Sequence, residues 1–146
     1  MGYGKVSTSL EGGAGASQTL YKAKTSARRY VRSNVITAVV FDLDLGSSRN
    51  RKSFTRYPLD AGLYRVFAFC IFEQLRSNPA YIYLDVNGVR TYVGRGATSE
   101  STVLHRAPLI ADAPLELTEP SDLSIFVGAD YNSYLNPDSY LVVTQL

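Results

Sequence analysis

Residues 62–72 read Gly62-Leu63-Tyr64-Arg65-Val66-Phe67-Ala68-Phe69-Cys70-Ile71-Phe72. β-Branched and aromatic residues dominate this stretch, which is typical of a β-strand. Successive side chains of a strand point to opposite faces. One face therefore carries Leu63, Arg65, Phe67, Phe69 and Ile71, and the other carries Tyr64, Val66, Ala68, Cys70 and Phe72. Both faces are largely apolar.

An apolar outer face needs a covering layer, because a strand of an antiparallel sandwich normally has one apolar and one polar face. The sequence offers no convincing amphipathic helix to supply that layer. A second subunit is the predicted cover, with Leu63, Phe67, Phe69 and Ile71 at the subunit interface. The alternative is that the N-terminal segment folds back over the same face.

Further short strands are expected on both sides of residues 62–72. Asn87-Gly88 predicts a type I′ turn, and therefore a hairpin between residues 81–86 and 89–93. Other short apolar runs bounded by turn residues lie at 35–41, 102–105, 115–117, 123–127 and 140–144. About eight strands in total predict an all-β fold, an antiparallel jelly-roll β-sandwich.

The chain of 146 residues is long enough for one domain with its own core. Residues 1–33 are Gly-rich and have no sustained period of 2 or 3.6, which predicts an extended arm. Residues 34–146 are expected to form the jelly roll. No apolar signal segment occurs in residues 1–17, so we expect the protein to be made and kept in the cytosol, with no membrane partner.

Charge is distributed unevenly along the chain. Residues 1–56 carry ten Lys or Arg against three acids, a net of +7, and residues 57–146 carry five Arg against ten acids, a net of −5. The predicted partner-binding cations of the arm are Lys5, Lys22, Lys24, Arg28, Arg29 and Arg32. They favour a negatively charged partner. The candidates are nucleic acid, an acidic protein surface and the acidic half of a neighbouring copy. The alternative is a solvated basic segment.

The sequence has little that points to catalysis. One Cys and one His exclude a disulfide framework and a zinc site built from repeated Cys and His. Cys70 lies in an apolar strand, where a thiol is inert, and His105 has no acidic neighbour to orient it. Gly94-Arg95-Gly96 lacks the Lys and the following helix of a phosphate loop, so a turn is predicted there. We therefore expect no enzyme activity, no cofactor and no metal.

Residues 62–67 have the pattern Gly-x-Tyr-x-aromatic, and residues 83–89, 115–127 and 139–143 follow as three later strand-like pieces. In this order the four pieces resemble strands of the complement globular-head family, whose fold is shared with tumour necrosis factor. The resemblance implies a jelly roll that trimerises around a threefold axis. Residues 1–33 match nothing in that family, and its usual stalk is absent, so its extracellular ligand-binding roles are not carried over.

These observations predict a non-enzymatic virion structural protein: a trimeric jelly roll of the phage capsid decoration, cement or head-fibre type. The arm would anchor it to a major capsid protein or another virion protein, assembled in the host cytoplasm. One alternative is a small icosahedral coat protein whose basic arm binds RNA. Another is a head domain that binds a receptor or a sugar through an exposed loop with Tyr131, Asn132 and Tyr134.

Overall fold

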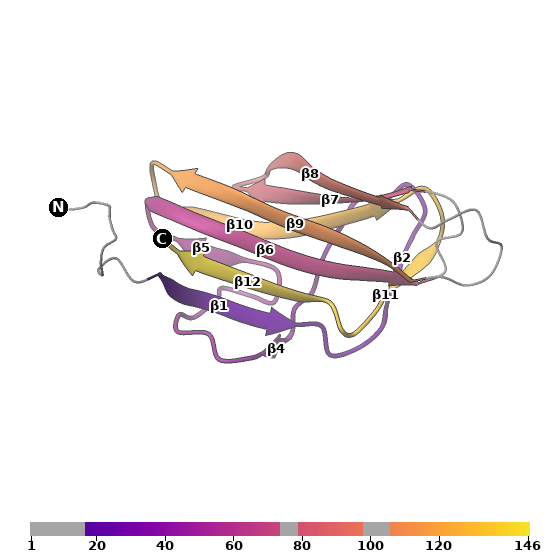
Figure 1. Cartoon of the computed structure of the whole chain (residues 1–146), viewed down its shortest axis with the longest axis horizontal. Helices are drawn as coiled ribbons and strands as arrows, with labels where there is room; N and C mark the ends of the chain where they lie inside the picture. The colour runs from indigo at the N-terminus through magenta and orange to yellow at the C-terminus, as the bar shows by residue number, and fades with distance from the viewer. Residues whose placement is uncertain (1–16, 74–78, 98–105) are drawn as a thin grey trace.

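The computed structural model describes residues 17–73, 79–97 and 106–146, and these form two antiparallel β-sheets packed face to face (Figure 1). No helix occurs among the described residues. The predicted all-β fold is thereby confirmed. Lys5, His105 and the strand expected at residues 102–105 lie outside the described residues.

The larger sheet has seven strands and is built around the long strand β6 (Gly62–Glu73). Its other members are β1 (Gln18–Lys24), β2 (Arg29–Val31), β4 (Leu43–Asp44), β9 (Arg106–Leu117), β11 (Ser133–Leu135) and β12 (Tyr140–Gln145). One edge of β6 pairs with β9 over its whole length. The other edge pairs with β12 and then with β11. β1 and β4 continue the sheet beyond β12, and β2 pairs with β11.

The smaller sheet has five strands and lies behind the larger one in Figure 1. It consists of β3 (Thr37–Ala38), β5 (Tyr57–Leu59), β7 (Pro79–Val86), β8 (Val89–Ala97) and β10 (Ser121–Ala129). β7 and β8 form the hairpin that the sequence predicts. Asn87 and Gly88 have φ values of 53° and 89°, as a type I′ turn requires at its two central positions.

The core lies between the two sheets. The face of β6 that carries Tyr64, Val66, Ala68, Cys70 and Phe72 is at most 1% exposed, so it is the inner face. Leu123, Ile125 and Val127 of β10 and Leu141 and Val143 of β12 are equally buried. Burial of apolar area between the layers is the main source of stability in such a sandwich.

The predicted arm over residues 1–33 is wrong for its described part, because residues 18–24 form a full strand of the larger sheet. β1 lies between β12 and β4, and Tyr21 has no exposed surface. The register of β1 against β12 shifts between Thr19 and Tyr21. This bulge buries both Leu20 and Tyr21, and so it hides the period of 2 from a reading of the sequence.

Two smaller expectations also differ from the structure. The strand expected at residues 35–41 shrinks to Thr37–Ala38, although Val39 still donates a backbone hydrogen bond to Ile125, 2.8 Å. Gly94 lies within β8 and not in a turn. It lets β8 approach β9, because a Cβ at Gly94 would lie 2.8 Å from the carbonyl oxygen of Ile110.

Candidate functional site

The outer face of the larger sheet carries a set of apolar side chains, which we call the apolar patch. Its members are Leu63, Phe67, Phe69, Ile71, Ile110, Tyr140 and Val142. Leu63 and Ile110 are 53% and 51% exposed. The Tyr140 ring lies 5.9 Å from that of Phe67 and 5.5 Å from that of Phe69, centroid to centroid. The predicted interface residues of β6 therefore share one uncovered face among the described residues.

One ion pair crosses this face. Arg65 of β6 donates from Nε and from Nη2 to the two carboxylate oxygens of Asp112 on β9, at 2.7 and 2.6 Å. The hydrogen bonds from Arg65 hold the pKa of Asp112 below its usual value. The pair separates Leu63 from Phe67 on this face, and both of its side chains remain partly exposed, at 61% and 38%.

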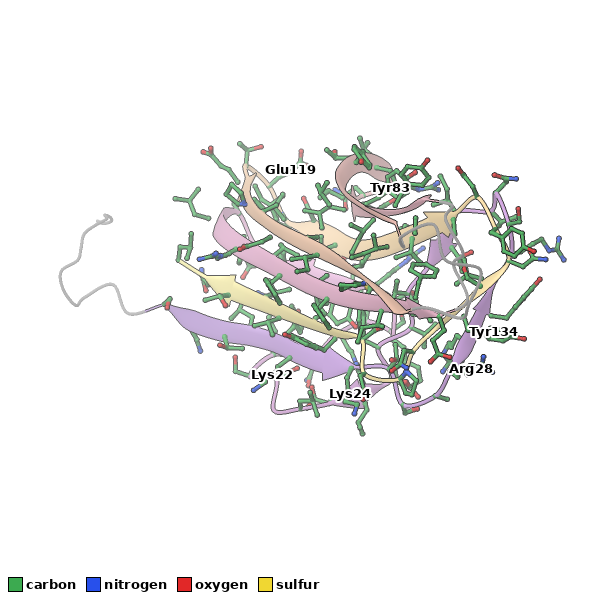
Figure 2. The ribbon with its side chains drawn as sticks, turned by 45° about the vertical axis from the view of Figure 1, so that its right-hand side comes forward. Lys22, Lys24, Arg28, Tyr83, Glu119 and Tyr134 are labelled. Carbon is green, nitrogen blue, oxygen red and sulfur yellow. The ribbon has the colours of Figure 1, made fainter. Side chains whose placement is uncertain are left out.

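The two flanks of the apolar patch carry opposite charges. β1 contributes Lys22 and Lys24 on the β12 side, and neither makes an ion pair with a described residue. β9 contributes the exposed Glu116 on the other side, directly opposite Leu63, and Glu119 follows in the next turn. Figure 2 shows Lys22 and Lys24 at the bottom of the view and Glu119 at the top.

The remaining predicted cations do not form a continuous basic arm. Arg28 stacks its guanidinium 3.8 Å from the centroid of the Tyr134 ring and pairs with Glu73 at 3.1 Å. Arg29 pairs with Asp42 at 3.6 Å. Arg32 is exposed just beyond β2. These contacts give Arg28 and Arg29 local structural roles, and a partner-binding role for the set stays a prediction.

The predicted contact loop is only partly a loop. Tyr131 and Asn132 are exposed in the turn between β10 and β11, where the side-chain oxygen of Asn132 accepts a hydrogen bond from the Ser33 amide, 2.8 Å. Tyr134 lies in β11 with its ring against Arg28 and 5.4 Å from that of Tyr30. The expectation that Tyr134 lies on an exposed loop is therefore wrong.

The described residues offer little for bond-making chemistry. Cys70 has no exposed surface, and burial raises the pKa of its thiol to about 12. No group of three or more His, Cys, Asp or Glu among the described residues is placed to hold a metal ion. A groove of about 310 Å³ is lined by Arg49, Lys52, Asp60 and Asp122 among others. Its charges are paired across its own walls, Arg49 with Asp60 at 3.1 Å and Lys52 with Asp122 at 2.8 Å.

A second exposed surface was missed by the sequence analysis. Tyr81 and Tyr83 of β7 and Tyr92 of β8 share the outer face of the smaller sheet. The Tyr92 ring lies 6.1 Å from that of Tyr81 and 6.0 Å from that of Tyr83, centroid to centroid. Tyr81 and Tyr83 are two residues apart on one strand of the predicted hairpin, and Tyr92 lies on the other strand. This spacing in the sequence indicates that the three side chains share one face.

Comparison with known proteins identifies solved structures with a similar fold. No protein-family model and no curated protein matches the sequence. Among solved structures, murine APRIL superposes with a TM-score of 0.63 at 13% identity, over 90% of this chain and all of that one. Eiger TNF from S. frugiperda has a TM-score of 0.62 at 13% identity, over 89% of this chain and 91% of that one. The globular domain of zebrafish complement 1qA has a TM-score of 0.58 at 12% identity, over 86% and 94%.

The predicted resemblance to the complement globular-head and tumour necrosis factor jelly rolls is thus confirmed as a likeness of fold. At this level of identity the likeness shows the fold alone, and function rests on the surfaces described above. The described residues include no helix with the length and hydropathy of a membrane span.

Proposed function

We propose that this chain is a non-enzymatic structural protein that assembles into a homotrimer through the apolar patch. The uncovered apolar face of the larger sheet carries this proposal. Leu63 and Ile110 are half exposed, with aromatic residues between them, and a group of exposed apolar side chains of this kind is typical of an interaction surface. A second copy of the chain would remove it from water.

The charges beside the patch favour a cyclic arrangement. Lys22 and Lys24 flank one side and Glu116 flanks the other, so the two flanks of a single copy have opposite sign. Head-to-tail packing would bring the acidic flank of one copy to the basic flank of the next, and such contacts form a ring when the rotation between neighbouring copies closes. The family resemblance implies that the ring has three members.

We extend this proposal to a virion component of the capsid decoration, cement or head-fibre type, bound to a major capsid protein and assembled in the host cytoplasm. Arg32 and Arg56 are exposed and make no ion pair with a described residue, and they support attachment to a negative surface. Two observations disfavour the RNA-binding coat protein: Arg28 and Arg29 are engaged by Glu73 and Asp42. A free RNA-binding arm would leave both arginines available to phosphate.

The assembly is tested by light scattering on the purified chain. A trimer of the 16.0 kDa chain has a mass of about 48 kDa. Phe67→Arg places a charge in the apolar patch and is expected to give a folded monomer. The matched control is Phe54→Arg, which changes a 52% exposed phenylalanine outside the patch and should leave the trimer intact. A wild-type mass of 16.0 kDa at micromolar concentration would contradict the proposal.

The virion role is tested by sedimentation of the protein with purified particles at increasing salt. Docking on a protein shell should survive moderate salt, whereas binding to nucleic acid weakens steeply with ionic strength. Removal of residues 1–16 is the variant of choice, because removal of residues 1–33 would also delete β1 from the sheet. Retained sedimentation after that removal would contradict anchoring by residues 1–16.

A further inference from the structure

The smaller sheet has one edge that no described residue covers. β3 lies at the end of the strand order, and its pairing partner is β10. Val39 extends that pairing, because its backbone N–H donates to a carbonyl oxygen of β10 at 2.8 Å. Alternate residues of an antiparallel strand direct their backbone groups to the same side. Thr37 and Val39 therefore face β10, and the residues between and beside them face away from it.

The residues that face away form what we call the open edge, Ile36, Ala38 and Val40. No hydrogen bond joins their backbone N–H or C=O groups to another described residue. The loop that leads into β5 lies on the other side, because the carbonyl oxygen of Phe54 accepts a hydrogen bond from the backbone N–H of Phe41. By the same alternation, that N–H faces the β10 side. Ile36 is 41% exposed, so solvent reaches the open edge.

The open edge lacks the features that protect other strand edges. Residues 33–41 contain no charged residue and no proline. By contrast, β9 pairs with β6 at one edge of the larger sheet and carries Pro108, Pro114 and Glu116. Proline lacks the backbone donor and charges repel an incoming strand, so such residues block edge-to-edge pairing. An edge of apolar residues without them is a template for one more strand.

We propose that the open edge pairs with the same edge of a second copy of the chain, in an antiparallel register centred on Ala38. In this register Ala38 lies opposite Ala38 of the second copy, and Ile36 lies opposite Val40. Every free backbone N–H and C=O of the two open edges then meets a partner. An uncharged segment meets itself without like-charge repulsion. The contact has a twofold axis, so both copies use the same surface.

The two ends of the segment favour the antiparallel orientation. Arg32 precedes the open edge and Asp44 follows it, and both residues are exposed. Neither makes an ion pair with a described residue. Antiparallel pairing brings the Arg32 end of one copy toward the Asp44 end of the other, whereas parallel pairing would bring two arginines together. Charge complementarity therefore supports a second copy as the occupant.

This contact goes beyond the proposed trimer. The open edge belongs to the smaller sheet, whereas the apolar patch lies on the outer face of the larger one. One short pair of edges buries little surface, so the contact is weak by itself. A trimer carries three open edges, and their pairing would join trimers into larger species as the protein concentration rises.

The test is sedimentation velocity of the full chain from about 10 μM to about 1 mM. The reference is the mass at the lowest concentration, so the readout does not depend on whether that species is a trimer. The wild-type mass is expected to rise above this reference. Ala38→Lys and Ala38→Glu should each keep the reference mass, because like charges would lie directly opposite each other. An equimolar mixture of the two variants should associate again, because opposite charges then meet.

Two further variants control for the fold and for added charge. Ala38→Pro removes the backbone donor without adding a charge, and it should also keep the reference mass. Because the N–H of Ala38 faces away from β10, this proline is compatible with the sheet. The matched control is Thr91→Lys, which places the same charge at an exposed position of β8, at the other end of the same sheet. It should associate like the wild type. Thermal melts establish that each variant is folded.

Three results would overturn the proposal. One is a wild-type mass that stays constant over the whole concentration range. Another is association of folded Ala38→Lys by itself, or a mixture with Ala38→Glu that stays at the reference mass. The third is a rise in mass that appears only after removal of residues 1–16, because that segment, and not a second copy, would then occupy the open edge. A failure of the trimer changes the reference mass alone and leaves these comparisons intact.

Discussion

Substitution of Tyr21 tests whether the N-terminal part of the chain belongs to the core. The Tyr21 ring is fully buried and meets the Tyr57 ring edge to face, with centroids 5.1 Å apart. Its hydroxyl donates a hydrogen bond to the carbonyl oxygen of Pro58, 2.6 Å. Burial raises the pKa of the Tyr21 phenol to about 12, so the hydroxyl keeps its proton at a pH where an exposed tyrosine would ionise. These contacts join β1 of the larger sheet to β5 of the smaller one.

The expected losses of unfolding free energy follow from these contacts of Tyr21. Tyr21→Phe removes the hydroxyl and leaves the Pro58 carbonyl without its partner, which costs about 1–2 kcal/mol of unfolding free energy. Tyr21→Ala also removes the ring and its packing, for a total of about 4 kcal/mol. For a chain of this length, the melting temperature should fall by about 2–8 °C for Tyr21→Phe and about 8–16 °C for Tyr21→Ala.

Urea denaturation and thermal melting measure these changes. All variants are compared at one protein concentration, because the stability of an oligomer depends on its concentration. The control is Tyr30→Phe, which removes a hydroxyl from a 52% exposed ring and should change stability by less than about 0.5 kcal/mol. If Tyr21→Ala melts like the wild type, residues 18–24 do not pack in the core, and the placement of β1 is refuted.

Three further predictions concern single side chains. Gly94→Ala should destabilise by about 1–3 kcal/mol in thermal melts, since its Cβ would lie 2.8 Å from a backbone carbonyl oxygen of β9. Gly128→Ala, whose Cβ would have 3.5 Å to its nearest neighbour, should melt close to the wild type, and equal losses would contradict this reasoning. The hydrogen bond from the Ser26 hydroxyl lowers the pKa of Asp42 in the folded protein. This hydrogen bond therefore stabilises the fold fully above the unfolded-state pKa of 3.8, and the stabilisation is lost as pH falls through the lower folded-state pKa. Ser26→Ala should raise that pKa in an NMR titration, and an unchanged midpoint would refute this cause. Cys70, the only cysteine, should react with a thiol reagent only as the protein unfolds, and rapid labelling of the native state would show that its strand opens.

The strands and turns that depend only on residues close together in the chain follow from the sequence alone. Residues 62–72 carry alternating apolar side chains of strand type, and β6 forms there with Tyr64 and Phe72 inward. The Asn87-Gly88 pair accepts positive φ at both positions, so the β7–β8 hairpin follows from two residues. The same alternation places Phe67 and Phe69 together on the outer face.

Tertiary structure decided what depends on partners distant in the sequence. β1 was missed because a bulge at Thr19–Tyr21 breaks its alternation, and only its place between β12 and β4 makes these residues a strand. Pairing of β6 with β9 brings Ile110 beside Phe69 and places Glu116 across the patch from Lys22. Strand neighbours are chosen by packing across the whole sandwich, so the two charged flanks do not follow from any local stretch of sequence.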